Sequence, residues 1–141
     1  MKDKEIEIAQ QIVIDASSGI LGRIASYAAK QALLGKKVII VNCDGALITG
    51  KRRFTISEYL SKRRRGGSSL NGPHFPKYPY RLMKRTIRGM LSYQQQRGLN
   101  AYKRIICYND IPEEYVSAQK ISTMQNISTK TINLQELSRE M

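Results

Sequence analysis

The stretch that decides the fold runs from Ile12 to Val41 and reads IVIDASSGILGRIASYAAKQALLGKKVIIV. Short β-branched runs at its two ends, residues 12–14 and 38–41, predict two buried strands. Between them, apolar residues recur at helical spacing and form a narrow stripe of mostly small side chains: Leu21, Ile24, Ala25, Ala28 and Ala32. Strand, helix and strand in this order predict a βαβ unit with parallel strands and a right-handed crossover.

The turns of this unit are open to two interpretations. Asp15–Gly19 predicts a turn with helix-capping side chains, and Gly35 predicts the end of the helix. Gly19 and Gly22, followed by Asp44, match the placement of glycines and a ribose-binding acid in a dinucleotide-binding fold. Because the full glycine motif is missing, we interpret these glycines as serving a tight turn and close helix packing. A Rossmann-like nucleotide-binding enzyme stays as the alternative function.

The next segment adds a second helix and a long loop. Residues 46–48 predict a short extended piece, and residues 51–62 predict a helix with Ile56, Tyr59 and Leu60 on one side. A loop of about 16 residues follows and contains Gly72-Pro73. Its length is too great for a simple connection in a compact domain, which indicates a functional or disordered segment.

The remaining elements are one helix and two strands, with a short helix at the end. Residues 81–91 predict a helix, and residues 104–108 predict a third strand that ends before Pro112. The C-terminal part, 117–141, is less clearly patterned. In it, residues 130–134 predict a fourth strand and residues 135–139 a short helix. At this length we expect a single domain over residues 1–141.

Positive charge is concentrated in one segment of the 141-residue chain, whose formal net charge is +13. Residues 51–104 hold 15 basic residues and one acid, Glu58, a net charge of +14, whereas the rest of the chain has a net charge of −1. Surfaces of ordinary domains mix the two signs. The segment therefore predicts an anionic partner, with nucleic acid favoured over a membrane surface.

Several other classes of protein are disfavoured by the sequence. The first seven residues mix charges and lack an apolar core, which argues against a signal peptide. The longest apolar run is far shorter than the ~20 residues of a membrane-spanning helix. A basic amphipathic helix with bulky aromatic residues, typical of membrane-surface binding, is missing too. Cys43, Cys107 and His74 cannot easily supply four zinc ligands, so we expect reduced, buried cysteines and no metal, cofactor, small-molecule substrate or membrane partner.

The helix predicted over residues 81–91 carries the clearest functional pattern. Four cations recur at i, i+3, i+4 and i+7 and form one stripe along this helix: Arg81, Lys84, Arg85 and Arg88. The opposite arc holds the apolar residues Leu82, Met83, Ile87, Met90 and Leu91. We expect phosphate contacts from this stripe, from the two ends of the preceding helix and from the neighbouring basic residues. The predicted RNA-binding residues are Lys51, Arg52, Arg53, Lys62, Arg63, Arg64, Arg65, His74, Lys77, Arg81, Lys84, Arg85, Arg88, Arg97, Lys103 and Arg104.

Two local motifs favour nucleic-acid binding over a catalytic function. Gly45 to Lys51 fits the start of a P-loop, but Arg52 stands where Ser or Thr would bind Mg²⁺. A glycine and a lysine at a helix entry still offer backbone N–H groups and positive charge to a phosphate. His74 lies near Phe75, Tyr78 and Tyr80, and aromatic rings among arginines are suited to stacking on RNA bases.

The order of short motifs resembles one known family. Ile14-Asp15-Ala16 and Leu21-Gly22-Arg23-Ile24-Ala25-Ser26 are similar to the opening of the large-subunit ribosomal protein family thirteen (the L-thirteen family). Matching motifs follow over residues 12 to 112: Val38 to Cys43, Thr49-Gly50-Lys51, Gly72-Pro73, Arg85 to Leu91, Arg97-Gly98, Ala101, Lys103-Arg104, Tyr108 and Ile111-Pro112. The Gly72-Pro73 loop is similar to the archaeal and eukaryotic branch. Ser92 and Gln94–Gln96 depart from the proline and basic residues usual in the family.

The resemblance implies a three-layer α/β/α fold around a parallel sheet of about four strands, with a long basic loop and helix extension. It also implies a non-catalytic structural protein of the large ribosomal subunit that binds rRNA and supports assembly. The expected partners are large-subunit rRNA and neighbouring ribosomal proteins, and the expected location is the cytoplasmic ribosome.

Overall fold

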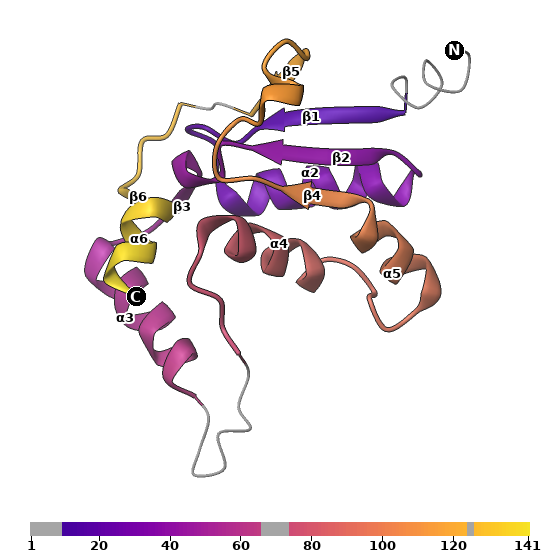
Figure 1. The fold of residues 1–141 in the computed structure, drawn as a ribbon. Helices are drawn as coiled ribbons and strands as arrows, with labels where there is room; N and C mark the ends of the chain where they lie inside the picture. The colour runs from indigo at the N-terminus through magenta and orange to yellow at the C-terminus, as the bar shows by residue number, and fades with distance from the viewer. Residues whose placement is uncertain (1–9, 66–73, 124–125) are drawn as a thin grey trace.

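The computed structural model describes residues 10–65, 74–123 and 126–141, which form a mixed α/β arrangement (Figure 1). The Gly72-Pro73 motif and the rest of residues 66–73 in the long loop lie outside these residues. At the centre is the βαβ unit that the sequence predicts: β1 (Gln11–Asp15), α2 (Leu21–Leu33) and β2 (Lys37–Val41). Its two strands are parallel and pair Val13 with Ile39.

Two further strands extend this pair into a four-stranded parallel sheet with the order β4-β2-β1-β5. β4 (Ile105–Cys107) is the third strand predicted from the sequence, and it pairs with β2. The fourth strand of the sheet is β5 (Lys120–Ser122), which the sequence analysis did not predict. The sheet and its helices confirm the expected fold, which is consistent with three α/β/α layers.

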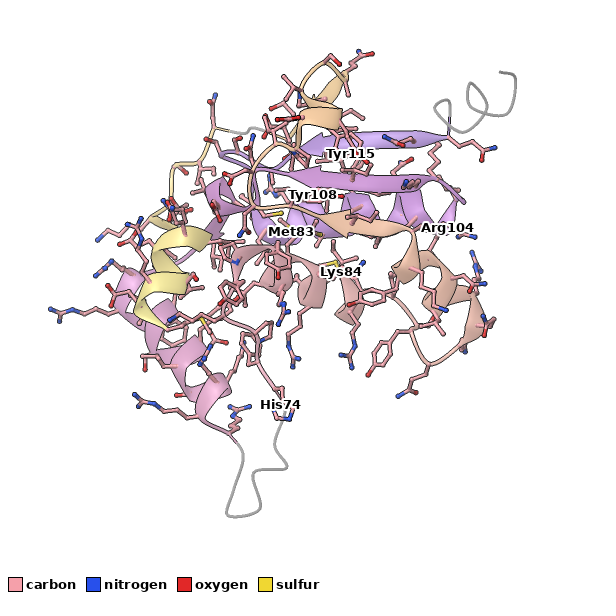
Figure 2. The ribbon with its side chains drawn as sticks, viewed as in Figure 1. His74, Met83, Lys84, Arg104, Tyr108 and Tyr115 are labelled. Carbon is pink, nitrogen blue, oxygen red and sulfur yellow. The ribbon has the colours of Figure 1, made fainter. Side chains whose placement is uncertain are left out.

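Alternation along the strands sends side chains to two different cores. Ile14, Val38 and Ile40 face the helices α2 and α4 (Pro79–Gly89), where α2 contributes its alanine stripe. On the opposite face of the sheet, Val13, Ile39 and Val41 are covered by Tyr115 and its neighbours. Tyr115 belongs to a short 3₁₀ turn, η2 (Glu113–Tyr115). The centre of its ring lies 6.1 Å from the centre of the Tyr108 ring. Figure 2 shows both tyrosines in front of the sheet, on the side away from α2.

The turn after β1 corrects one prediction. The residue that precedes α2 is Ile20, and no side chain caps the helix there. Instead, the Asp15 carboxylate accepts hydrogen bonds from the backbone and hydroxyl of Ser17 and from the Asn42 amide, at 3.0, 2.5 and 3.1 Å. Asp15 therefore joins the ends of β1 and β2, which a local capping pattern cannot reveal. The predicted helix end is confirmed, because Gly35 has φ +94° directly after α2.

The C-terminal strand lies outside the parallel sheet. β6 (Thr131–Asn133) pairs antiparallel with β3 (Leu47–Thr49), so the predicted C-terminal strand exists but joins a separate two-stranded sheet. It leads directly into α6 (Leu134–Glu140), whose first turn is capped because the Asn133 side chain accepts from the Glu136 N–H at 2.7 Å. Together β6 and α6 place the end of the chain beside the beginning of α3 (Arg52–Arg64) (Figure 1).

Two helix assignments differ from the prediction. α4 begins at Pro79 rather than Arg81, because proline at the first helical position has the right φ and needs no N–H partner. A further helix, α5 (Gln96–Lys103), was not predicted. Its Gly98 lies against the Ser92 carbonyl so closely that a Cβ would come within 2.0 Å of that oxygen. Glycine usually destabilises a helix, but Gly98 allows α5 to pack against the backbone at Ser92.

Candidate nucleic-acid interface

The basic stripe of α4 is held outward by an apolar face on the other side of the helix. Leu82, Met83 and Ile87 are all buried in the main core. The start of the helix is fixed by Asn109, whose side-chain oxygen accepts from the Tyr80 N–H at 3.0 Å. α4 also packs on α2 and on β4. Its position is thus set by the scaffold, and its cations follow from that position.

The α4 cations line one hollow of about 300 Å³. Its walls come from three parts of the chain, namely the segment before α4, α4 itself and α5. The lining residues are Arg81, Lys84, Arg85 and Arg88 from the stripe, together with His74, Pro76 and Tyr102. Figure 2 shows His74 below α4, where the described chain resumes, and Lys84 near β4. The structure therefore brings five predicted RNA-binding residues to one place.

Lys84 differs from the three arginines of the stripe. Its amine donates to the carbonyl oxygen of Tyr102 at 3.0 Å and to that of Ile105. Burial lowers the pKa of this amine, although the nearby Cys107 opposes the shift. A cation that binds the last carbonyls of a helix stabilises the helix end. Lys84 therefore fastens the end of α5 to α4, a role that its place in the stripe does not reveal.

Arg104 has a similar internal role. Its guanidinium donates to the Ala32 carbonyl at 3.1 Å, near the end of α2. Its neighbours on α5, Arg97 and Lys103, are exposed. Of these three predicted RNA-binding residues, Arg104 is the one whose guanidinium binds the end of another helix, α2.

Phe75 joins the two basic helices. Its ring meets that of Tyr59 on α3 edge to face, with 5.5 Å between the centroids. The Arg85 guanidinium of α4 lies 4.7 Å from the centre of the Phe75 ring, and the Lys62 amine of α3 lies 6.0 Å from it. Cations near an aromatic face are attracted by its quadrupole. One ring thus brings Lys62 and Arg85, 23 positions apart in the sequence, to the same region.

Two other arginines of α4 are also held against aromatic rings. The Arg81 guanidinium lies 5.9 Å from the Tyr78 ring and 5.8 Å from the Tyr80 ring, and these two rings are stacked. The Arg88 guanidinium lies 4.3 Å from the Tyr93 ring, and a hydrogen bond from Arg88 lowers the pKa of the Tyr93 hydroxyl. These contacts restrict the arginine side chains before any ligand arrives.

α3 presents its cations in a different way. Thr55 is the one buried residue of this helix, and the remaining side chains are exposed or partly exposed. At its start, Arg52 donates to Glu136 at 2.6 Å and to Glu140 at 3.1 Å, which ties α3 to α6. Near its end, Lys62 pairs with Glu58 at 3.0 Å. Lys51, Arg53, Arg63, Arg64 and Arg65 are exposed and, within the described residues, form no ion pair. Lys77, before α4, is also exposed.

The structure explains one of the two glycines around the start of α2. A Cβ at Gly19 would lie 2.4 Å from the Thr123 hydroxyl and 2.8 Å from Ile24, so this glycine permits close packing, as interpreted from the sequence. Gly22 lies in open space, and close packing does not explain it. Asp44 belongs to a 3₁₀ turn, η1 (Cys43–Gly45), rather than to the end of β2. Cys43 and Cys107 are buried free thiols, as predicted.

Metal sites and membrane-spanning helices are not found among the described residues. In the part of the chain that the structure describes, no group of three or more His, Cys, Asp or Glu side chains is placed to hold a metal ion. None of the described helices is both long and apolar enough to cross a membrane.

Comparison with known proteins identifies the family. The model of the family "Ribosomal protein L13" matches residues 9–114. The chain belongs to the ribosomal protein L13 family. It is 44% identical over 135 residues to large ribosomal subunit protein uL13 of Methanosarcina barkeri, covering 92% of this chain and 96% of that one. Family membership makes the chain a structural ribosomal protein, not the nucleotide-binding enzyme that we kept as an alternative.

Other archaeal relatives are similar over most of their length. The uL13 protein of Archaeoglobus fulgidus is 41% identical, with 90% of this chain and 85% of the relative covered. That of Methanocaldococcus jannaschii is 39% identical, with 92% and 96% covered. These archaeal relatives agree with the archaeal and eukaryotic branch that the Gly72-Pro73 loop indicated from the sequence.

The structure adds residues that sequence reasoning left aside. Tyr102 lines the hollow, Tyr93 holds Arg88, and Asn109 fixes the start of α4. Tyr93 and Tyr102 lie within the basic segment, so interleaving of aromatic and basic residues is a signal that could have found them. Asn109 follows β4 and meets α4 only through the fold, so no local pattern points to it.

Proposed function

We propose that this chain is a structural component of the large ribosomal subunit that binds rRNA through the basic face of α3, α4 and α5 and supports subunit assembly. The proposal rests on one observation above the others. The arginines of α4 line a single hollow while the opposite side of that helix is buried in the core. A rigid row of cations that is not neutralised by acids is suited to a phosphate backbone.

The proposed RNA contacts are the cations that are not already bound to a carboxylate or a backbone carbonyl of the protein. The first group is Arg81, Arg85 and Arg88 in the hollow, with His74 at its edge. The second group is Lys51, Arg53 and the run Arg63, Arg64 and Arg65 at the two ends of α3, followed by Lys77, Arg97 and Lys103. Arg52 and Lys62 contribute if RNA displaces their carboxylate partners. Lys84 and Arg104 act mainly inside the protein, because their charges already meet backbone carbonyls.

The relatives' names and the shape of the surface support further partners. The three relatives are each named a large ribosomal subunit protein, which supports the same subunit as the location of this chain. Leu34 at the end of α2 is 65% exposed and Met90 is 45% exposed, and they border the same groove. Large exposed apolar side chains are typical of protein contacts, which supports neighbouring ribosomal proteins as partners.

Co-sedimentation tests the proposal. Tagged protein mixed with a lysate of an archaeal relative's cells depleted of its own uL13 should migrate with the large subunit on a sucrose gradient. The matched control is Arg85→Glu/Arg88→Glu, which keeps the buried face of α4 and should shift protein toward the top of the gradient. Wild-type protein that stays at the top, while a second tagged large-subunit protein migrates with the subunit, would contradict the proposal.

A further inference from the structure

We propose that the hollow on α4 binds one unpaired nucleotide of RNA, with the base inside the hollow and the phosphates on the arginines around it. The inference rests on the proposed RNA binding and makes it more specific. It predicts that this chain contacts a nucleobase as well as the phosphate backbone.

The shape of the site is the first argument. Arg81, Arg85 and Arg88 do not project from a flat face but line a concavity of about 300 Å³. That volume is at the lower end of the range for small-molecule sites, about 300–1,000 Å³. The hollow is thus of the size for a single nucleotide rather than for a groove of a double helix.

The second argument is the chemistry of the walls. Between the cations lie an imidazole, a pyrrolidine ring and a phenol ring, contributed by His74, Pro76 and Tyr102. His74 is exposed and Tyr102 is partly exposed, and the Lys84 amine lies 4.4 Å from the centre of the Tyr102 ring. Unstacked RNA bases are recognised by stacking on aromatic rings and on guanidinium planes. A site for phosphate alone does not need two aromatic rings and a proline in its walls.

The third argument is that the cations are already held in position. Arg85 lies against Phe75 and Arg88 against Tyr93, at 4.7 and 4.3 Å from the ring centres. The Lys84 amine donates to two backbone carbonyls and lies 4.4 Å from the centre of the Tyr102 ring, so it too is held in place. A site whose groups are fixed in advance loses less conformational entropy when a ligand binds.

Paired RNA cannot use this hollow in the same way. Bases in an A-form helix are stacked, and its deep, narrow major groove does not admit side chains. A base enters a concave site only when it leaves the stack, as in loops, bulges and single strands. The geometry therefore favours an unpaired nucleotide over a duplex, even though a duplex has more phosphates.

The test compares RNAs that differ in their bases but not in their phosphates. Fluorescence anisotropy at one fixed salt concentration would give the Kd for a uridine 12-mer and for a 12-mer of the same backbone without bases. Base–aromatic stacking corresponds to a loss of about 5- to 100-fold in affinity when the base is removed. We expect a loss in this range. Equal Kd values for the two RNAs would overturn the proposal.

Three variants locate the base. His74→Ala and Tyr102→Leu should each reduce the difference between the two RNAs, and they should change binding of the abasic RNA little. Phe54→Ala is the matched control, because Phe54 is an exposed ring on the basic helix α3 and does not line the hollow. His74 is exposed, so its variant should fold normally. If Phe54→Ala abolishes the difference and His74→Ala does not, the base lies outside the hollow and the proposal is wrong.

The failure of this inference can be told apart from failure of the proposed function. If rRNA fragments bind with strong salt dependence but bases make no difference, only the nucleotide site is wrong. If neither rRNA fragments nor the 12-mers bind, RNA binding itself is wrong, and the nucleotide site is overturned with it.

Discussion

α3 and α4 are both strongly basic, but they are attached to the protein in different ways. α4 buries Leu82, Met83 and Ile87 in the main core, whereas α3 buries only Thr55. α3 is held from outside, by the exposed ion pairs of Arg52 with α6 and by partly buried side chains such as Tyr59. Exposed ion pairs of this kind contribute little to stability, because water screens the two charges. The two helices thus show that equal charge in the sequence does not mean equal rigidity in the fold.

This difference suggests a division of labour. α4 is a rigid platform, and the direction of its arginines is fixed by the core beneath it. α3 is a cationic arm whose position depends on weaker contacts with Phe75 and α6. Changes in α4 should therefore affect either stability or binding according to the face they touch, while changes in α3 should affect mainly binding.

The largest expected effect comes from the buried face of α4. Ile87→Ala removes a fully buried side chain and should lower the free energy of unfolding by about 2–5 kcal/mol. The matched change on α3 is Ile56→Ala, which truncates a partly buried side chain and should cost about 1 kcal/mol or less. Urea denaturation followed by circular dichroism measures both. Similar losses for the two variants would mean that α3 is anchored as firmly as α4.

The second expected effect concerns binding without loss of stability. Arg85→Glu/Arg88→Glu should weaken binding to rRNA fragments by about 10- to 100-fold, because two phosphate contacts become repulsive. Arg63→Glu/Arg64→Glu makes the same change in charge at the exposed end of α3 and should cause a smaller loss. Filter binding at one salt concentration compares them, with urea denaturation as the control for folding. Equal losses would show that the hollow has no special role.

The third expected effect separates Lys84 from the rest of its stripe. Lys84→Met leaves the carbonyls of Tyr102 and Ile105 without their donor and should lower the free energy of unfolding by about 1–3 kcal/mol. Arg85→Met should change stability much less and rRNA affinity more. Measuring both properties for both variants tests whether the two neighbours have different roles. A stable Lys84→Met protein with reduced affinity would place Lys84 among the RNA contacts.

The sequence predicted the elements of the fold better than their partners. Residues 12–41 were sufficient to predict β1, α2 and β2, because β-branched runs strongly favour strands and an alanine stripe at helical spacing strongly favours a helix. It was not sufficient for β5, whose three residues are exposed or partly exposed and carry no apolar pattern. Nor could it show that the C-terminal strand pairs with β3, because strand pairing over such a distance leaves no local trace.

For the site, the sequence predicted which residues carry charge but not what each charge meets. Helical spacing correctly grouped Arg81, Arg85 and Arg88 on one face. The same spacing included Lys84, which binds the Tyr102 carbonyl of α5 and the Ile105 carbonyl of β4, and the basic run included Arg104, which reaches α2. Capping partners belong to other elements, and only the tertiary fold brings them within reach.

The smallest expected effect lies in the scaffold that carries both helices. Burial raises the pKa of the Asp15 carboxyl, but hydrogen bonds from Ser17 and Asn42 and the charge of Lys120 outweigh it, so the pKa is lowered from 3.8. The folded state thus binds this proton less tightly than the unfolded chain. The stabilisation is present above the unfolded pKa and is lost as the pH falls through the lower folded pKa.

Asp15→Asn should remove this contribution, about 1–2 kcal/mol at neutral pH for hydrogen bonds to a charged group. The difference from the wild type should disappear in strong acid, where the wild-type carboxyl is also protonated. Urea denaturation at a series of pH values measures it, and the contrast between Ile87→Ala and Ile56→Ala should persist in this background. A difference that does not depend on pH would mean that the Asp15 charge has no part in stability.

The decisive measurement is the salt dependence of binding to large-subunit rRNA fragments. With about 6–10 phosphates neutralised by the basic face, the affinity should fall by about 10³- to 10⁵-fold between about 50 and 200 mM salt. The slope of log K against log salt concentration should also be shallower for Arg85→Glu/Arg88→Glu, because those phosphate contacts are lost. A flat salt profile for the wild-type protein would contradict rRNA binding through this basic face.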